Sequence, residues 1–189
     1  MDKTAIEHWS PVIGGQFWWI GLIFVLIFVP LMIFLGSKIS SKQRDMVLYG
    51  MGIYQLGNKA LTQIGYIFSD NYIMASNLPL HLCGLSGILA GIVVFYRKQI
   101  LFEFLYFFGL VGFIHSVLTP EFTGGVSSWK IFDYYVGHSM LIIIPLWLMK
   151  YYEFRLRHNA WWTSFIYLQL IVVLVSQANS IIGNGAYYM

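Results

Sequence analysis

Four side chains in this sequence have the chemistry of a nucleophile and its bases. Cys83 is the only cysteine of the chain, and it lies with His81 in the stretch "NLPLHLCGLSG". His115 and His138 follow in the next two apolar stretches. A thiolate activated by an imidazole can attack an acyl ester and form a covalent intermediate. Cys83 is therefore a candidate nucleophile, and His138 and His115 are candidate bases.

His81 and Cys83 are not expected to act as a pair, because residues two apart on a helix point to different sides. The base for Cys83 must come from another helix. His81 would orient a substrate headgroup or hydrogen-bond a backbone carbonyl. Cys83 also has a structural explanation: Cys83, Gly87 and Gly91 repeat every four residues and form a small-residue face for close helix packing.

Composition identifies the element type that must position these residues. Hydrophobic residues make up 58% of the 189 residues and charged residues only 10%, whereas soluble domains carry about a quarter charged residues. The apolar runs are continuous rather than alternating, which favours helices over a barrel. The net charge of +3 comes from short loops, so no nucleic-acid partner is expected. We predict an all-α, polytopic transmembrane helix bundle.

Six stretches reach the roughly 20 mostly apolar residues that a spanning helix needs. We expect them to form a single transmembrane domain over residues 1–189, with spans at about 17–35, 46–68, 78–96, 100–118, 134–149 and 160–182. The loop of residues 119–133 is the only connection of any length. The second span is the weakest because it holds Asn58 and Lys59, and we expect Lys59 to pair with Glu103 of the fourth.

Loop charges predict the orientation, because Lys and Arg are enriched in cytoplasmic loops. The loops after the first, third and fifth spans hold eight basic residues, and the other side has only Lys3 and Lys130. The eight are Lys38, Lys42, Arg44, Arg97, Lys98, Lys150, Arg155 and Arg157. We therefore expect an integral membrane protein with its N-terminus outside.

This orientation brings the polar residues into one layer near the outer surface. At about 1.5 Å per residue, His81 and Cys83 lie within roughly 10 Å of the outer end of their span. Polar groups in a bilayer are costly and usually face a bundle interior or a water-filled cavity. We expect a pocket that opens to the outer leaflet. The same layer holds His115, Thr119, Asp133, His138, Gln177 and Asn179.

Within this pocket we assign His81, Thr119, Asp133, Gln177 and Asn179 to substrate binding. Asp133 would also fix the tautomer of His138. A zinc ion could use the three histidines with Asp133 or Glu121, but no two histidines have the i, i+4 spacing that forms such a site in advance. A haem would need axial histidines on facing helices. We predict neither a metal nor a cofactor.

Three blocks of the chain resemble the YwaF-type family of bacterial integral membrane proteins, which is related to eukaryotic transmembrane lipid acyltransferases. The blocks are "LPLHLCGLSG" (78–87), "FFGLVGFIHSVLTPEF" (107–122) and "FDYYVGHSMLII" (132–143). The resemblance implies a bacterial plasma membrane. The eukaryotic branch is described as acting on ether-linked lysophospholipids through a cysteine and a histidine. Cys83 matches that cysteine, and His138 is the first choice for the histidine, with His115 second.

The resemblance implies a membrane-embedded lipid acyltransferase or lipid hydrolase, with membrane lipids as partners and a lysophospholipid or acyl lipid as substrate. The family continues past a segment similar to "IIGNGAYYM" into a further span, so we expect seven spans in the family and six here. A missing seventh helix would leave the pocket open. Two alternatives remain: a non-enzymatic lipid or small-molecule binding protein or transporter, and a cluster that only satisfies helix ends.

Overall fold

The computed structural model describes residues 8–68, 77–123 and 127–183. Within these ranges the chain forms six helices and one pair of two-residue strands, so the predicted all-α bundle is confirmed with one small addition. The elements are β1 (His8–Trp9), α1 (Gln16–Lys38), α2 (Ser41–Ile67), α4 (Leu82–Phe95), α5 (Gln99–Leu118), β2 (Phe122–Thr123), α6 (Ser128–Tyr151) and α7 (Ala160–Ile182). β1 pairs antiparallel with β2.

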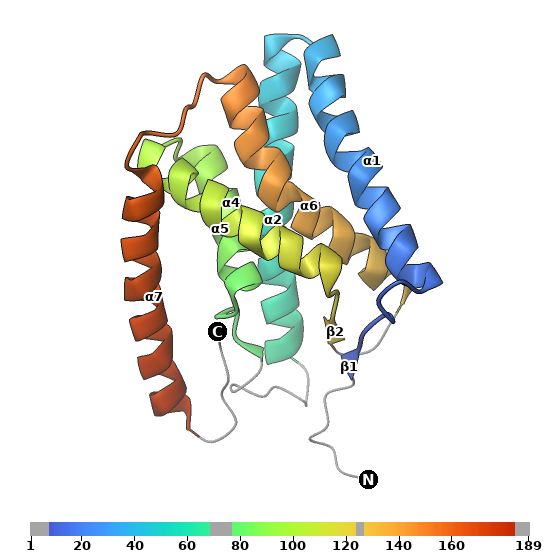
Figure 1. Cartoon of the computed structure of the whole chain (residues 1–189), viewed down its shortest axis with the longest axis vertical. Coiled ribbons are helices and arrows are strands. Elements are labelled where there is room, and N and C mark those ends of the chain that lie inside the picture. Colours follow the sequence, from blue (N-terminus) through green and yellow to red (C-terminus); the bar gives the residue numbers. More distant parts are fainter. Residues whose placement is uncertain (1–7, 69–76, 124–126, 184–189) are drawn as a thin grey trace.

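Helices α4 and α6 form the centre of the bundle (Figure 1). α2 and α5 each pack against both of them, α1 flanks α6, and α7 stands beside α5 at one side. The core lies where α2, α4, α5 and α6 meet, and it includes the fully buried side chains of Leu48, Val93, Phe102 and Ile144. α1 and α7 expose apolar side chains along their length, as expected of helices that face lipid.

Four helices, α1, α5, α6 and α7, are long and apolar enough to cross a membrane. α4 is apolar but has only 14 residues. α2 has 27 residues and is capped at Ser40 by a reciprocal pair of hydrogen bonds with Gln43, but its composition is polar for a span. Four of the six predicted spans thus meet both criteria, and the second and third remain predictions.

The third predicted span begins later than the sequence indicated, at Leu82 instead of residue 78. Pro79 accounts for the first part of the delay, because the residue before a proline avoids helical geometry, and the turn of residues 78–81 precedes the helix. His81 consequently sits at the N-cap in an extended conformation, with φ −65° and ψ 148°. It does not lie in the first turns of the helix.

The fifth predicted span begins earlier, at Ser128 instead of residue 134. The hydroxyl of Ser127 accepts a hydrogen bond from the backbone N–H of Lys130 at 3.2 Å, and such a cap stabilises a helix start. The last six residues of the expected loop of residues 119–133 are therefore helical, and Asp133 lies on α6.

Close contact between α5 and α6 depends on Gly109. A β-carbon at this position would lie only 2.6 Å from the backbone oxygen of Leu141. A backbone atom cannot move aside as the end of a side chain can, so the helices would have to separate.

We expect Gly109→Ala to destabilise the protein by about 1–3 kcal/mol, the usual cost of overpacking a core. Gly57→Ala on α2 is the matched control, because a β-carbon there would meet nothing within 4 Å. Thermal unfolding of the purified variants in detergent compares them. Equal midpoints for the two variants would contradict this reading of the α5–α6 contact.

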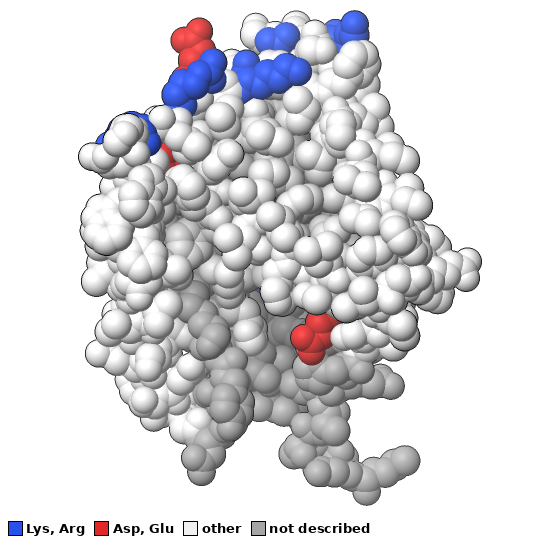
Figure 2. Space-filling view, viewed as in Figure 1, with Lys and Arg blue, Asp and Glu red and all other residues white. Residues whose placement is uncertain are grey.

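Basic side chains gather at one end of the bundle (Figure 2), which we call the basic end. There the carboxylate of Asp45 accepts hydrogen bonds from Tyr152 at 2.7 Å and from Arg97 at 3.3 Å. Burial raises the pKa of Tyr152 to about 12, and the hydrogen bond to Asp45 adds to this increase. The Tyr152 hydrogen bond, followed by Arg97, lowers the pKa of Asp45. The stabilisation from Asp45 is therefore present above its usual pKa and is lost as the pH falls through the lowered value.

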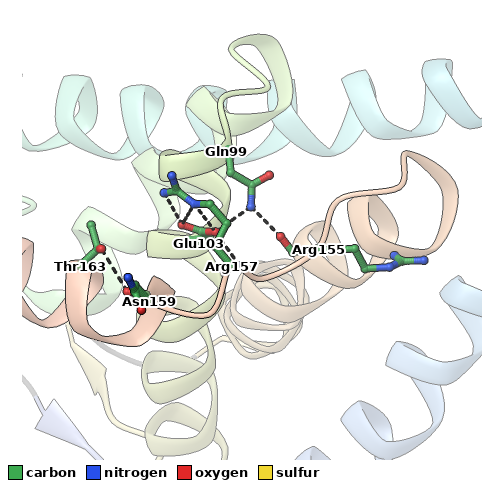
Figure 3. A network of polar contacts seen from close by, with 6 residues as sticks. All are labelled: Gln99, Glu103, Arg155, Arg157, Asn159 and Thr163. Carbon is green, nitrogen blue, oxygen red and sulfur yellow. Dashed lines mark hydrogen bonds and ion pairs between the residues drawn. The ribbon is translucent and has the colours of Figure 1, made fainter.

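A second network at the basic end fastens the segment between α6 and α7 to α5 (Figure 3). The side chain of Glu103 is 1% exposed, and its oxygens accept from the Arg157 guanidinium at 2.7–3.1 Å and from the Arg157 backbone N–H at 2.9 Å. Gln99 donates to Glu103 at 2.7 Å. The carboxylate raises the pKa of Arg157. The predicted pairing of Lys59 with Glu103 is therefore wrong, because Arg157 occupies the carboxylate.

Candidate functional site

A carboxylate in the bundle interior joins α6 to α2. Asp133 accepts a hydrogen bond from the Tyr54 hydroxyl at 2.5 Å and two from the Asn58 amide at 3.0 and 2.9 Å. Tyr54 and Asn58 are four residues apart on α2, so their side chains lie on the same face. This network fixes the first turns of α6 against α2.

His138 lies about a turn and a half further along α6. Its Nδ1 is 2.7 Å from the backbone oxygen of Tyr134, and the two rings pack with centroids 4.2 Å apart. A carbonyl only accepts, so Nδ1 carries the hydrogen and Nε2 presents its lone pair. Gln55 of α2 donates to the backbone oxygen of Gly137 at 2.8 Å. An imidazole held in this way presents Nε2 as a hydrogen-bond acceptor.

Cys83 lies in the first turn of α4 and is half-buried against α5. Its Sγ is 3.9 Å from the backbone oxygen of Gly112, to which the thiol donates. It is also 3.7 Å from the position that a β-carbon on Gly112 would take. Among the residues that the structure describes, Cys83 makes no hydrogen bond to His115 or His138. Tyr134 connects His138 to α5, because its ring packs on His138 and its hydroxyl donates to the backbone oxygen of Ser116 at 3.1 Å.

An apolar groove of about 220 Å³ runs beside this turn of α4, between α4, α5 and α7. Its lining includes Leu82, Ser86 and Phe108. The hydroxyl of Ser86 lies 4.0 Å from the same β-carbon position on Gly112 that Cys83 approaches. Ser86 thus belongs both to the groove and to the surroundings of the thiol. The groove has the apolar character that an alkyl chain requires.

Lys59 of α2 brings a positive charge into the same interior. Its Cε and Nζ lie 2.9 and 3.8 Å from the position that a β-carbon on Gly87 of α4 would take. Asp133 and His138 of α6, and Cys83 of α4 when it is ionised, are near enough to interact electrostatically with this ammonium. Ionisable residues inside a membrane bundle usually face the interior and mark functional sites.

The structure separates the predicted site residues into two groups. Cys83, Asp133 and His138 contribute to the interior, whereas His81, His115 and Thr119 are exposed. The Thr119 hydroxyl donates to the backbone oxygen of His115 at 2.9 Å, so it completes the last turn of α5. The expected single layer of three inward-facing histidines is therefore not formed, and His138 is the one inside.

The two predicted residues on the last helix also lie apart from the interior. α7 packs against α5. Gln177 is exposed and Asn179 is half-buried. A role for these two side chains in substrate binding remains a prediction.

The histidines do not form a metal centre within the described ranges. No group of three or more His, Cys, Asp or Glu side chains there is placed to hold a metal ion. The exposed positions of His81 and His115 explain why the zinc arrangement considered from the sequence does not arise.

Sequence reasoning missed four residues that build the interior: Tyr54, Gln55, Asn58 and Tyr134. A usable signal was present in the second span, where Tyr54 with Asn58 and Gln55 with Lys59 repeat at a spacing of four. Polar residues at this spacing form one face of a helix. Such a face inside an otherwise apolar chain indicates contact with another helix.

The apolar helices, their exposed outer faces and the polar interior define a polytopic helical integral membrane protein. Residues 7–189 match the TMEM164 family, and the chain belongs to this family of transmembrane proteins. No curated protein and no solved structure matches the chain.

Proposed function

We propose that this protein is a membrane-embedded enzyme that acts on the acyl esters of lipids, as an acyltransferase or a hydrolase. The observation that carries the proposal is that Cys83 approaches the same point on Gly112 as Ser86, which lines an apolar groove between α4, α5 and α7. A nucleophile beside a channel for an alkyl chain is what attack on a lipid acyl group requires. The resemblance of the blocks around Cys83 and His138 to lipid acyltransferases supports the same reaction.

His138 is the base in this proposal. Its Nδ1–H is committed to the backbone oxygen of Tyr134, which leaves Nε2 to accept a proton. The Asp133 network with Tyr54 and Asn58 holds the helix that carries His138. At rest the Cys83 thiol donates to Gly112, and it exchanges this bond for His138, directly or through a water molecule, when it reacts.

The reaction then proceeds in two balanced steps. His138 takes the thiol proton, the sulfur attacks the acyl carbonyl, and the ester C–O bond breaks as the leaving alkoxide receives the proton. This step leaves a thioester on Cys83. A lysolipid hydroxyl or water then gives its proton to His138 and attacks the thioester. The new C–O bond forms, the C–S bond breaks, and the thiolate is protonated again.

We place the basic end in the cytoplasm, as the loop charges predict. Cys83 lies at the start of α4, the end of that helix remote from Arg97 and Lys98, so the site would open toward the outer leaflet. Exposed His81 and Thr119, near the same end, would contact a lipid headgroup.

The second candidate is a protein that binds a lipid or another small molecule without reacting with it. It is favoured by the hydrogen bond of the Cys83 thiol to Gly112, which a packing cysteine would also make. In that case the thiol is dispensable and the interior charges contact the ligand.

Cys83→Ala separates the two candidates. An enzyme that uses the thiol should lose acyl turnover by about 10³-fold or more, because the covalent step is removed. Cys83→Ser should lose nearly as much, because a hydroxyl is a weaker nucleophile with the same base. The assay follows labelled acyl chains released from diacyl phosphatidylethanolamine, or transferred to lysophosphatidylethanolamine, by the purified protein in nanodiscs.

Ser37→Ala, at the basic end of α1, serves as the control and should keep full turnover. Circular dichroism and size-exclusion chromatography establish that each variant is folded. Wild-type turnover in folded Cys83→Ala would rule out the nucleophile and leave the binding protein.

A further inference from the structure

Lys59 is a basic residue in the bundle interior, and the partner predicted for it from the sequence was wrong. Within the described part of the chain, its ammonium makes no hydrogen bond and no ion pair within 4.0 Å. Glu103 is held by Arg157 and Gln99 at the basic end. Asp133, the acidic group that acts on Lys59, is engaged by Tyr54 and Asn58. Within the described residues, the Lys59 amine thus has no counter-ion in contact.

The direction of the Lys59 side chain shows that its amine does not extend to the membrane surface. A lysine near a helix end can extend its stem to the interface. Here the end of the stem lies against Gly87, with Cε and Nζ 2.9 and 3.8 Å from the β-carbon position. Gly87 has no side chain that would fill this space. The amine is therefore directed into the interface of α2 with α4, the helix that carries the cysteine.

Cys83 and Gly87 are four residues apart on α4, which is about one helical turn and about 6 Å along the axis. Residues at this spacing lie on the same face. Lys59 thus contacts the face that carries the thiol, one turn away, and it is near enough to interact electrostatically with a thiolate there. A side chain of four methylene groups can cover part of that distance by rotating about its own bonds.

We propose that Lys59 is the positioning residue that stabilises the thiolate of Cys83. This inference deepens the proposed function and rests on Cys83 being its nucleophile. An anion in the apolar interior is costly unless a cation lies beside it, and an unpaired cation there is costly as well. When Cys83 loses its proton, each charge becomes the counter-ion of the other. Lysine and other cations near cysteine are known to favour the thiolate.

The other titratable groups around the pair come from α6 and from the segment before β2. Asp133 and His138 are within electrostatic range of Lys59, and Tyr134 is within electrostatic range of Cys83. Glu121 acts on Tyr134. α5 contributes Gly112 and Ser116 to this region, and neither titrates. A change in Lys59 therefore alters the cation of the group and leaves the other members in place.

The test measures the thiol itself and not the enzyme reaction. Cys83 is the only cysteine, so the rate at which iodoacetamide modifies the full-length protein reports thiolate at this position. The rate is measured from pH 6 to 10, in nanodiscs of phosphatidylcholine, for the wild type, Lys59→Met and Lys59→Arg. Lys42→Met, in the exposed first turn of the same helix, is the control.

Lys59→Met is expected to lower the alkylation rate at neutral pH by about tenfold, the effect of one unit of thiol acidity, and to move the rise in rate to higher pH. Lys59→Arg and Lys42→Met should follow the wild type. Lys59→Gln replaces Lys59→Met if the latter does not fold. A wild-type profile in a folded variant without the charge would overturn the inference. If the shift occurs but the wild type has no acyl turnover, the proposed function fails and the role of Lys59 toward the thiol stands.

Discussion

Arg157→Met is expected to lower the midpoint of thermal unfolding by roughly 5–10 °C, the largest loss of stability that we predict for a single substitution. The reason is an asymmetry in the pair. Glu103 is 1% exposed, whereas the Arg157 side chain is 56% exposed. Removing the guanidinium leaves a carboxylate inside the protein with Gln99 as its remaining side-chain donor. The segment between α6 and α7 also loses the guanidinium bonds that attach it to α5, and it keeps the bonds from the Arg157 backbone N–H to Glu103 and from Gln99 to the Arg155 carbonyl.

Glu103→Gln should be milder than Arg157→Met, because the freed guanidinium can turn into water and the buried group becomes neutral. The double variant should be more stable than the sum of the two single losses predicts, since it no longer buries an unpaired charge. Melting of all three proteins in detergent completes the cycle. Additive losses, or a milder effect for Arg157→Met than for Glu103→Gln, would contradict this description of the network.

His138→Gln is expected to lower acyl turnover by 10²- to 10⁴-fold, the usual contribution of a general base. Glutamine keeps a side-chain N–H that can reach the backbone oxygen of Tyr134, but it supplies no basic nitrogen. The matched control is His115→Gln. His115 was the second choice for the base, but its side chain is exposed on α5, and turnover should remain within a few-fold of the wild type.

Both histidine variants are assayed for acyl release and transfer in the same nanodiscs, after circular dichroism has shown that they are folded. Equal losses in the two variants would show that the interior position of His138 has no special role. A loss confined to His115→Gln would assign the base to the exposed histidine.

The helices follow from the sequence to the extent that hydropathy decides them. The apolar runs around α1, α5 and α7 predict those elements within a few residues, because a spanning helix is defined by its own composition. The starts of α4 and α6 depend on local chemistry instead. Pro79 delays the first, and the Ser127 cap advances the second. A hydropathy window smooths over both signals.

The site was less predictable, because it depends on which helix faces are in contact. Cys83 and His138 are candidates from their residue types together with the family resemblance. The network around Asp133 requires α2 to present Tyr54 and Asn58 toward α6, and the place of Lys59 requires Gly87 to face α2. These contacts depend on the rotation and register of neighbouring helices. Counting residues along each span gives the depth of a side chain in the membrane, but it gives neither the rotation nor the register.

The central claim, that Cys83 carries the acyl group, is tested most directly by mass spectrometry of the protein after incubation with diacyl phosphatidylethanolamine. The proposed mechanism predicts that the peptide containing Cys83 gains the mass of one acyl chain, that hydroxylamine removes it, and that Cys83→Ala shows no such species. Acyl turnover that proceeds with no acyl group on Cys83, at a rate that Cys83→Ala leaves unchanged, would contradict the claim.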